Sequence, residues 1–176
     1  FSGGMRQRVM IAIAAALQPD LLIADEPTTA LDVTVQAQIM ELLTGISRAE
    51  GMSILLITHD LGVAVDHADR VCVMYAGRVV DTGRVDEVLH RPSHPYTLAL
   101  MHSAPQAQDK ARKLRPIVGT PPDMARPPPG CPFHPRCSFA TDICRQEFPP
   151  RLSVAPGRFS ECHHARQVYE NARVVA

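Results

Sequence analysis

Residues 21–32 read LLIADEPTTALD, and this stretch decides the fold. Its first four residues form a short apolar run that follows a Pro-Asp turn signal and precedes two acids, which is typical of a buried central strand in a parallel sheet. Asp25 and Glu26 then stand at the carboxyl end of that strand. Because ligands of an open parallel sheet bind beyond the carboxyl ends of its strands, the stretch predicts an α/β fold and the place of its site.

The segments around this strand alternate between helical and strand patterns. Residues 2–17 predict a helix that Ser2 caps and that is apolar on nearly all sides, so we expect it to be buried. Apolar residues at helical spacing predict a second helix over residues 34–50, and Gly51 provides its C-terminal stop. Further expected elements are a buried strand over residues 53–58, a helix over 61–68, a hairpin of 71–75 with 78–81, and a helix over 85–90.

The composition changes sharply near residue 91. Residues 1–91 contain 2 of the 16 prolines, with 7 basic and 12 acidic residues, whereas residues 92–176 contain 14 prolines, with 11 basic and 6 acidic residues. We therefore expect two domains with a boundary at residue 91. Cys72 lies in a predicted strand of the first, where a buried small hydrophobic side chain is the simplest interpretation.

The net charge and the length of the apolar runs argue against several classes of protein. The formal net charge is zero, which argues against a uniformly basic nucleic-acid binder. The longest apolar run, residues 9–17, is much shorter than the roughly 20 residues that a membrane-spanning helix needs. The chain begins with Phe1 rather than a start methionine, so we expect it to be a fragment whose N-terminal part is missing.

Three groups of residues carry chemistry. An Asp-Glu pair after a buried strand suits hydrolysis of a nucleoside triphosphate, because one carboxylate can hold Mg²⁺ through its waters and the other can orient the attacking water. His59 follows the second strand, and residues 2–4 place a hydroxyl and two glycine amides at a helix N-terminus, which attracts phosphate. Taken singly, each group is also compatible with an ordinary solvated turn or loop.

Together the three motifs resemble the nucleotide-binding domain of ABC transporters, from the signature motif to the switch histidine. The resemblance implies that Asp25 is the Walker B aspartate, Glu26 the catalytic base and His59 the switch histidine that contacts the γ-phosphate. The implied fold is the C-terminal part of an ABC-type P-loop NTPase domain, with a parallel sheet and flanking helices. The implied activity is hydrolysis of ATP with Mg²⁺.

The same resemblance assigns the remaining nucleotide-binding residues. It implies that Ser2, Gly3 and Gly4 hold ATP across a dimer interface, against the P-loop of a second ABC ATPase subunit, and that Asp32 ends the D-loop. A P-loop requires a Gly-Lys pair, and the chain contains none. We therefore expect the P-loop in the missing N-terminal segment, and we do not expect this fragment to be a complete ATPase.

The proline-rich region narrows the resemblance. Residues 90–97, 119–122 and 128–133 resemble the C-terminal extension of oligopeptide and dipeptide importer ATPases. The resemblance implies a peripheral subunit at the cytoplasmic face of the inner membrane, working with transmembrane permease subunits and an extracytoplasmic peptide-binding protein, and not with nucleic acid. Two alternatives remain: a soluble ABC-type ATPase that acts on nucleic acid, and a non-catalytic remnant or interaction module that keeps only the dimer surface.

Four cysteines in this extension suggest a cross-link, and a cytosolic ATPase sits in a reducing compartment, where disulfides are rare. Zinc usually takes cysteine pairs spaced by two to four residues, which are absent here, whereas iron-sulfur clusters accept several spacings. The importer resemblance points to a [4Fe-4S] cluster, with zinc or unligated thiols as alternatives. The candidate ligands are Cys131, Cys137, Cys144 and Cys162.

Overall fold

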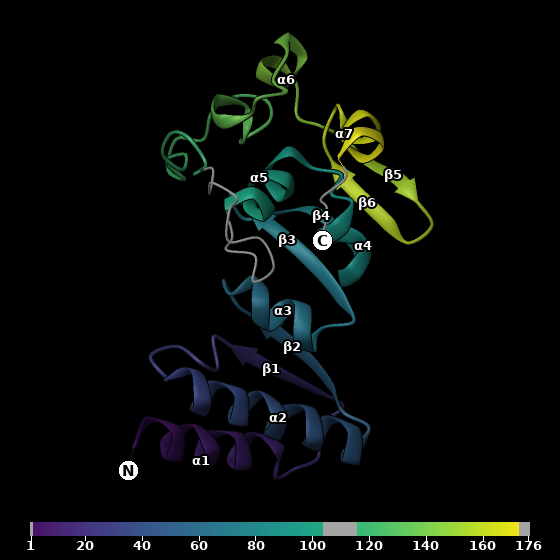
Figure 1. Cartoon of the computed structure of the whole chain (residues 1–176). Coiled ribbons are helices and arrows are strands. Elements are labelled where there is room, and N and C mark those ends of the chain that lie inside the picture. Colours follow the sequence, from purple (N-terminus) through teal and green to yellow (C-terminus); the bar gives the residue numbers. More distant parts are fainter. Residues whose placement is uncertain (1, 104–115, 173–176) are drawn as a thin grey trace, which may run out of the picture. The chain divides into compact units, whose positions relative to one another are not determined.

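The computed structural model describes residues 2–103 and 116–172 (Figure 1). Contacts divide the chain into two compact units, residues 1–68 and 69–176, which we call the first and second unit and describe separately. No helix among the described residues combines the length and apolar character needed to cross a membrane.

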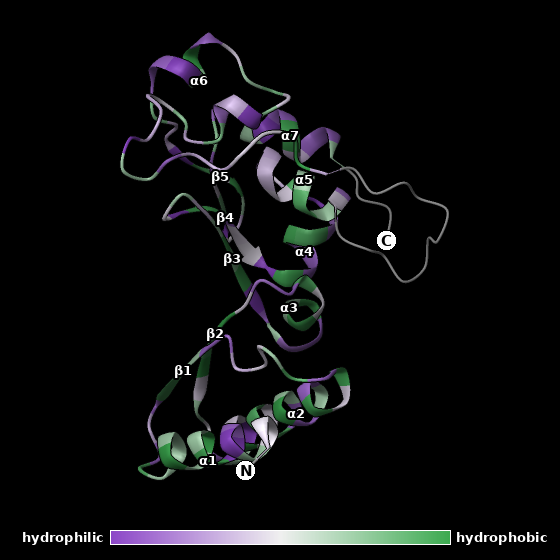
Figure 2. Ribbon diagram, turned by 90° about the vertical axis from the view of Figure 1, so that its left-hand side faces the viewer, coloured by the Kyte–Doolittle hydropathy of each residue, from purple (hydrophilic) through white to green (hydrophobic). Residues whose placement is uncertain are grey.

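The first unit has an α/β arrangement built on two strands. The strands β1 (Leu21–Asp25) and β2 (Ser53–Ile57) pair in parallel, as predicted. The helices α1 and α2 lie side by side on one side of the strands, and both carry hydrophobic residues toward a shared core (Figures 1 and 2). The helices are α1 (Gly3–Ala15), α2 (Val33–Glu50) and α3 (Leu61–His67).

Two expectations about burial in this unit were wrong. The helix α1 is not buried on all sides: Met10 and Ile13 are 63% and 67% exposed, because α1 packs against α2 along one side only. The strand β1 is not central, since among the described residues it pairs with β2 alone. Its burial alternates, with Leu22 buried and Ile23 62% exposed, as expected for a sheet covered on one face.

The second unit is built on an antiparallel sheet with strand order β3-β4-β6-β5. The predicted hairpin is confirmed: β3 and β4 meet at Ala76 and Gly77, whose φ angles of 49° and 74° suit a tight hairpin turn. Its strands are β3 (Arg70–Tyr75), β4 (Arg78–Arg84), β5 (Arg151–Ala155) and β6 (Arg158–Glu161). Its helices are α4 (Val85–His90), α5 (Pro95–Ser103), a 3₁₀ turn (His134–Arg136), α6 (Asp142–Gln146) and α7 (Ala165–Asn171).

The change of composition at residue 91 falls inside this second unit. The strand β4 lies before it and pairs with β6, which lies after it, so the proline-rich region contributes strands to a sheet that starts in the other region. The structural division thus comes at residues 68 and 69. The division at residue 91 into a nucleotide-binding portion and an extension stays a prediction.

An aromatic cluster forms the apolar core of the second unit. Tyr75 from β3 lies 4.6 Å from Tyr96 of α5 and 5.1 Å from Phe133, measured between ring centroids. The rings are tilted or edge-on, which is the arrangement that aromatic quadrupoles favour. The three rings join the hairpin, the helix α5 and the cysteine-containing loop into one core.

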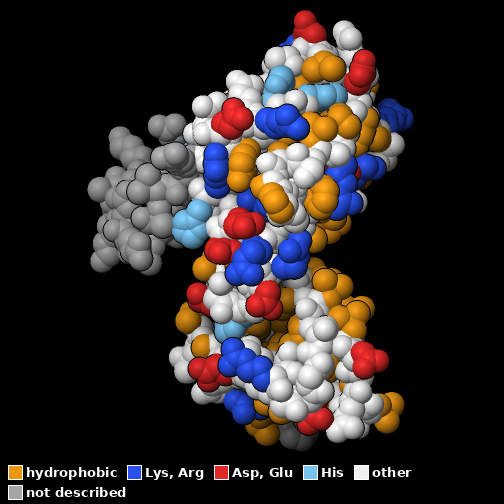
Figure 3. Space-filling view, turned by 90° about the vertical axis from the view of Figure 1, so that its right-hand side faces the viewer, with side chains coloured by type: hydrophobic (Ala, Val, Ile, Leu, Met, Phe, Trp, Pro, Cys, Tyr) orange, Lys and Arg blue, Asp and Glu red, His pale blue; other side chains and the backbone are white. Residues whose placement is uncertain are grey.

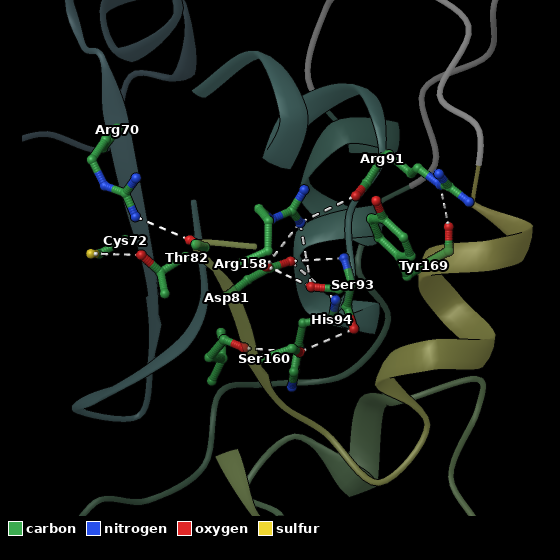
Figure 4. Close-up of polar contacts among 12 residues, drawn as sticks. Arg70, Cys72, Asp81, Thr82, Arg91, Ser93, His94, Arg158, Ser160 and Tyr169 are labelled. Atoms are coloured by element: carbon green, nitrogen blue, oxygen red, sulfur yellow. Dashed lines mark hydrogen bonds and ion pairs between the residues drawn. The ribbon is translucent and has the colours of Figure 1, made fainter. Parts of the chain in front are cut away.

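A buried polar cluster lies beside this core (Figure 4). The Asp81 carboxylate, fully buried in β4, accepts hydrogen bonds from the Ser93 amide (2.9 Å), the Ser93 hydroxyl (2.8 Å) and the His94 amide (3.1 Å). Arg158 of β6 is 1% exposed, and its Nη2 lies 3.3 Å from Asp81 Oδ1. These contacts attach residues 93–94, which directly precede α5, to the sheet.

The cluster depends on a glycine and on a neutral histidine. A Cβ atom on Gly83 would lie 2.0 Å from Cδ of Arg158, so only glycine leaves room for the arginine stem at this place in β4. Burial lowers the pKa of His94 to about 3, which keeps its ring neutral near pH 7. Its Nδ1 is then free to accept a hydrogen bond of 3.0 Å from the amide of Tyr96.

Candidate functional site

The candidate site lies where β1 and β2 end. Asp25 pairs with Ile57 in the parallel register, so the residues that follow both strands meet at one edge. The Glu26 amide donates a hydrogen bond of 2.9 Å to the Ile57 carbonyl, and Glu26 has a φ of 44°, in the left-handed region. This backbone turn directs the chain away from the strand immediately after Asp25.

The structure brings the two predicted catalytic residues into contact. His59 Nδ1 lies 2.8 Å from Glu26 Oε1. A third residue, Thr29, donates its hydroxyl to Glu26 Oε2 at 2.6 Å, and the sequence analysis did not single it out. The only available signal was a hydroxyl residue three positions after a carboxylate in a turn-rich stretch.

These contacts shift the ionisation of both groups. The hydrogen bond from Thr29, followed by that from His59, lowers the pKa of Glu26. The hydrogen bond to Glu26, followed by the negative charge of its carboxylate, raises the pKa of His59. The Glu26 side chain is 42% exposed and the His59 side chain is 79% exposed. Solvent therefore screens their attraction, and the pair adds little to the stability of the fold. The arrangement presents an ionised carboxylate beside an imidazole at an open strand edge.

The predicted phosphate-binding residues occupy the start of α1. The Ser2 hydroxyl accepts a hydrogen bond of 3.3 Å from the Met5 amide and so caps the helix, as expected. A Cβ on Gly4 would lie 2.6 Å from Val35 Cγ1, and one on Gly3 would lie 3.1 Å from Leu31 Cδ2. Both glycines therefore allow α1 to approach the start of α2 closely, and their role with ATP stays a prediction.

The other acids near the site cap helices. Asp32 accepts a hydrogen bond of 3.0 Å from the Val35 amide at the start of α2. Asp60 accepts one of 2.8 Å from the Gly62 amide at the start of α3, and its second oxygen lies 3.4 Å from Gln36 Nε2. Gln36, which the sequence analysis did not single out, thus joins α2 to Asp60 in the segment that carries His59.

The four cysteines of the proline-rich region are free thiols. Three are buried, Cys137 is half-buried, and the Cys131 amide donates a hydrogen bond of 2.8 Å to the Cys144 carbonyl. Burial raises the pKa of the Cys131 thiol, and it raises the pKa of Cys137 to about 11 and that of Cys162 to about 12. Charge repulsion from neighbouring cysteines adds to each of these shifts. Within residues 2–103 and 116–172, no three His, Cys, Asp or Glu side chains form a group that could hold a metal ion.

Cys72 lies apart from these four. It is exposed on β3, which corrects the expectation of a buried side chain, and its Sγ lies 3.3 Å from Thr82 Oγ1.

The face of the molecule in Figure 3 shows basic and acidic side chains interspersed, in keeping with a net charge of zero.

Comparisons with known proteins found a match in each of the two units. Residues 1–29 match the ABC transporter family, and residues 80–144 match the C-terminal region of oligopeptide/dipeptide transporters. The oligopeptide transport ATP-binding protein OppD of Salmonella typhimurium is 51% identical over 92% of this chain and 48% of its own length. The chain belongs to the oligopeptide/dipeptide transporter family of ABC ATP-binding proteins.

Further relatives support this membership in the transporter family. The dipeptide transport ATP-binding protein DppD of Escherichia coli is 54% identical over 93% of this chain and 50% of its own length. A solved ABC transporter in an inward-facing conformation is 28% identical, with a TM-score of 0.50, over 57% of this chain and 38% of its own. The chain spans about half the length of the curated relatives it matches. The predicted family and α/β class are thus confirmed.

Proposed function

We propose that the chain is part of the ATP-hydrolysing subunit of an ABC importer for oligopeptides or dipeptides. The observation that carries the proposal is the contact of Glu26 with His59 beyond the carboxyl ends of two parallel strands. It supplies a base beside an imidazole at the edge where a nucleotide would bind. The OppD and DppD proteins, which are named for oligopeptide and dipeptide transport, provide the substrate class.

In this proposal each residue at the strand ends has a separate task. Asp25, exposed at the end of β1, would hold Mg²⁺, which would supply positive charge beside the phosphates. Glu26 accepts the proton of the water whose oxygen bonds to the γ-phosphorus, while the bond from that phosphorus to the β-γ bridging oxygen breaks and ADP leaves. His59 uses Nδ1 for Glu26, which leaves Nε2 for the γ-phosphate.

The proposal also assigns parts of the chain to contacts within the assembled importer. Ser2, Gly3 and Gly4 would contact the ATP held on the P-loop of a second ATPase subunit, with Asp32 near the same interface. Residues 1–91 would form the nucleotide-binding portion and residues 92–176 the extension of the importer subunits. The subunit would work peripherally at the cytoplasmic face of the inner membrane, with permease subunits and an extracytoplasmic peptide-binding protein.

Transport by the assembled complex tests this function. Membrane vesicles that carry the complete importer should take up a labelled di- or oligopeptide when ATP is supplied on the cytoplasmic side, and unlabelled peptide should compete. A sugar of similar mass is the control, and it should neither compete nor enter. Uptake of the sugar in place of the peptide would refute the substrate class, and peptide uptake without ATP would refute the coupling.

The four-cysteine group is proposed to hold a [4Fe-4S] cluster. The four thiols are free, and the charges of the other three cysteines help to raise the pKa of Cys162, which supports a group that spans several sulfurs as thiolates. Bound iron would supply the positive charge that stabilises those thiolates and would cross-link the loop. Zinc remains the alternative, and among the described residues no group of His, Cys, Asp or Glu side chains is arranged to hold a metal ion of either kind.

Metal analysis distinguishes these ligands. Anaerobically purified protein should be brown, with about four irons and four sulfides per chain. Replacing Cys131, Cys137, Cys144 or Cys162 by Ser should lower the iron content and make residues 130–163 more sensitive to protease, because the loop then loses its cross-link. Cys72→Ser is the matched control, since Cys72 is exposed elsewhere on β3, and it should leave the iron unchanged. Colourless protein with one zinc would refute the cluster, and metal-free protein with a protease-resistant loop would refute both.

A further inference from the structure

We propose that Thr29 is a positioning residue for Glu26, an inference that rests on the function proposed above. Thr29 Oγ1 donates to Glu26 Oε2 at 2.6 Å, which is within the short range of hydrogen bonds from a hydroxyl to a carboxylate. Nothing in the chain's family membership or in its sequence patterns assigns this contact. It fixes the carboxylate from within the loop that carries it.

The two oxygens of Glu26 have different supports. Oε1 is held by His59, which comes from the segment after β2, and Oε2 is held by Thr29, only three residues away. In the proposed reaction His59 also contacts the nucleotide, so its position changes with the ligand. Thr29 has no such second task. It provides the support that stays with Glu26 whether or not His59 moves.

The backbone places the Thr29 hydroxyl within reach. The Thr29 amide donates to the Glu26 carbonyl at 3.2 Å, and the Glu26 amide donates to the Ile57 carbonyl of β2 at 2.9 Å. Because a glutamate side chain has three rotatable bonds, its orientation is otherwise loosely defined. A hydrogen bond from a turn anchored to the sheet therefore orients the carboxylate before the water arrives, which is the advantage of preorganised catalytic groups.

The test compares Thr29→Val with Thr29→Ser in the complete importer. Valine keeps the shape and removes the donor, so kcat for ATP hydrolysis should fall on the order of tenfold while KM for ATP changes less than about twofold. Serine restores the donor, and it should restore kcat. Thr29 is exposed, so neither change should disturb folding.

Glu26→Gln, assayed beside them, separates two failures. If it is inactive while Thr29→Val keeps normal kcat and normal KM for ATP, the positioning role is refuted and the proposed function stands. If Thr29→Val lowers kcat but serine fails to restore it, the hydroxyl is not the operative group and the inference is again refuted. If Glu26→Gln itself hydrolyses ATP normally, the proposed function has failed first.

Discussion

The Glu26→Gln variant of the complete subunit is expected to bind ATP and to lose its hydrolysis. Gln keeps the size of the side chain and can still bond to Thr29 and His59, but it cannot take a proton from water. General-base catalysis contributes about 10²–10⁴-fold, so steady-state phosphate release should fall by that factor. ATP binding, measured by filter retention at equilibrium, should be unchanged, and the ATP-bound dimer should be long-lived.

Glu41→Gln provides the matched control for this variant. Glu41 is exposed on α2, outside the contacts of Glu26, so the same chemical change there should leave phosphate release unaffected. Near-normal hydrolysis by Glu26→Gln would show that Glu26 is not the base. Loss of ATP binding would show instead that the carboxylate acts in nucleotide binding.

The largest expected effect on stability comes from Arg158→Met. Asp81 and Arg158 are 0% and 1% exposed, so removing the guanidinium leaves a buried carboxylate without its opposite charge. Such a loss costs about 3–5 kcal/mol in the free energy of unfolding. Burial already raises the pKa of Asp81, and losing Arg158 should raise it further. A raised carboxyl pKa means that the native state binds the proton more tightly, so the deficit should shrink as pH falls.

Tyrosine fluorescence during urea unfolding measures this effect in the second unit alone. All three tyrosines, Tyr75, Tyr96 and Tyr169, lie in that unit, and the chain has no tryptophan. Arg84→Met is the control, because Arg84 and Asp86 form a pair with the same 3.3 Å separation but with side chains 62% and 58% exposed. It should cost about 0–1 kcal/mol. Equal losses of unfolding free energy in the two variants would show that the buried pair of Asp81 and Arg158 stabilises the fold no more than an exposed pair does.

Local patterns predicted the first unit well. The helix over residues 34–50 and its stop at Gly51 correspond to α2 and its left-handed cap, and the parallel pairing of β1 with β2 follows from the alternation of elements. Glu26 and His59 were predicted as partners in function, and their contact follows from parallel strands ending at one edge. Burial of α1 was overestimated, because an apolar sequence does not reveal how many neighbours cover it.

Other contacts depend on neighbours that no local pattern reveals. The strands β5 and β6 are short and rich in Arg and Ser, and they form strands because β6 finds its partner in β4, far away in the sequence. Nothing in the local sequence predicts that Arg158 is buried, and its burial depends on the room that Gly83 leaves and on the charge of Asp81. Thr29 contacts Glu26 within a turn where Glu26 has a left-handed conformation and the Thr29 amide donates to the Glu26 carbonyl, and neither feature is evident in the sequence.

The pairing of β4 with β6 has a consequence for synthesis on the ribosome. Asp81 and its partner Arg158 are 77 residues apart in the chain. At ordinary rates of about 5–20 residues per second, β6 is synthesised roughly 4–15 s after β4. During that interval the β3–β4 hairpin has an unpaired edge, with Asp81 still in contact with water. The second unit must therefore complete its sheet late in translation, whereas β1 and β2 of the first unit can pair as soon as residue 57 has emerged.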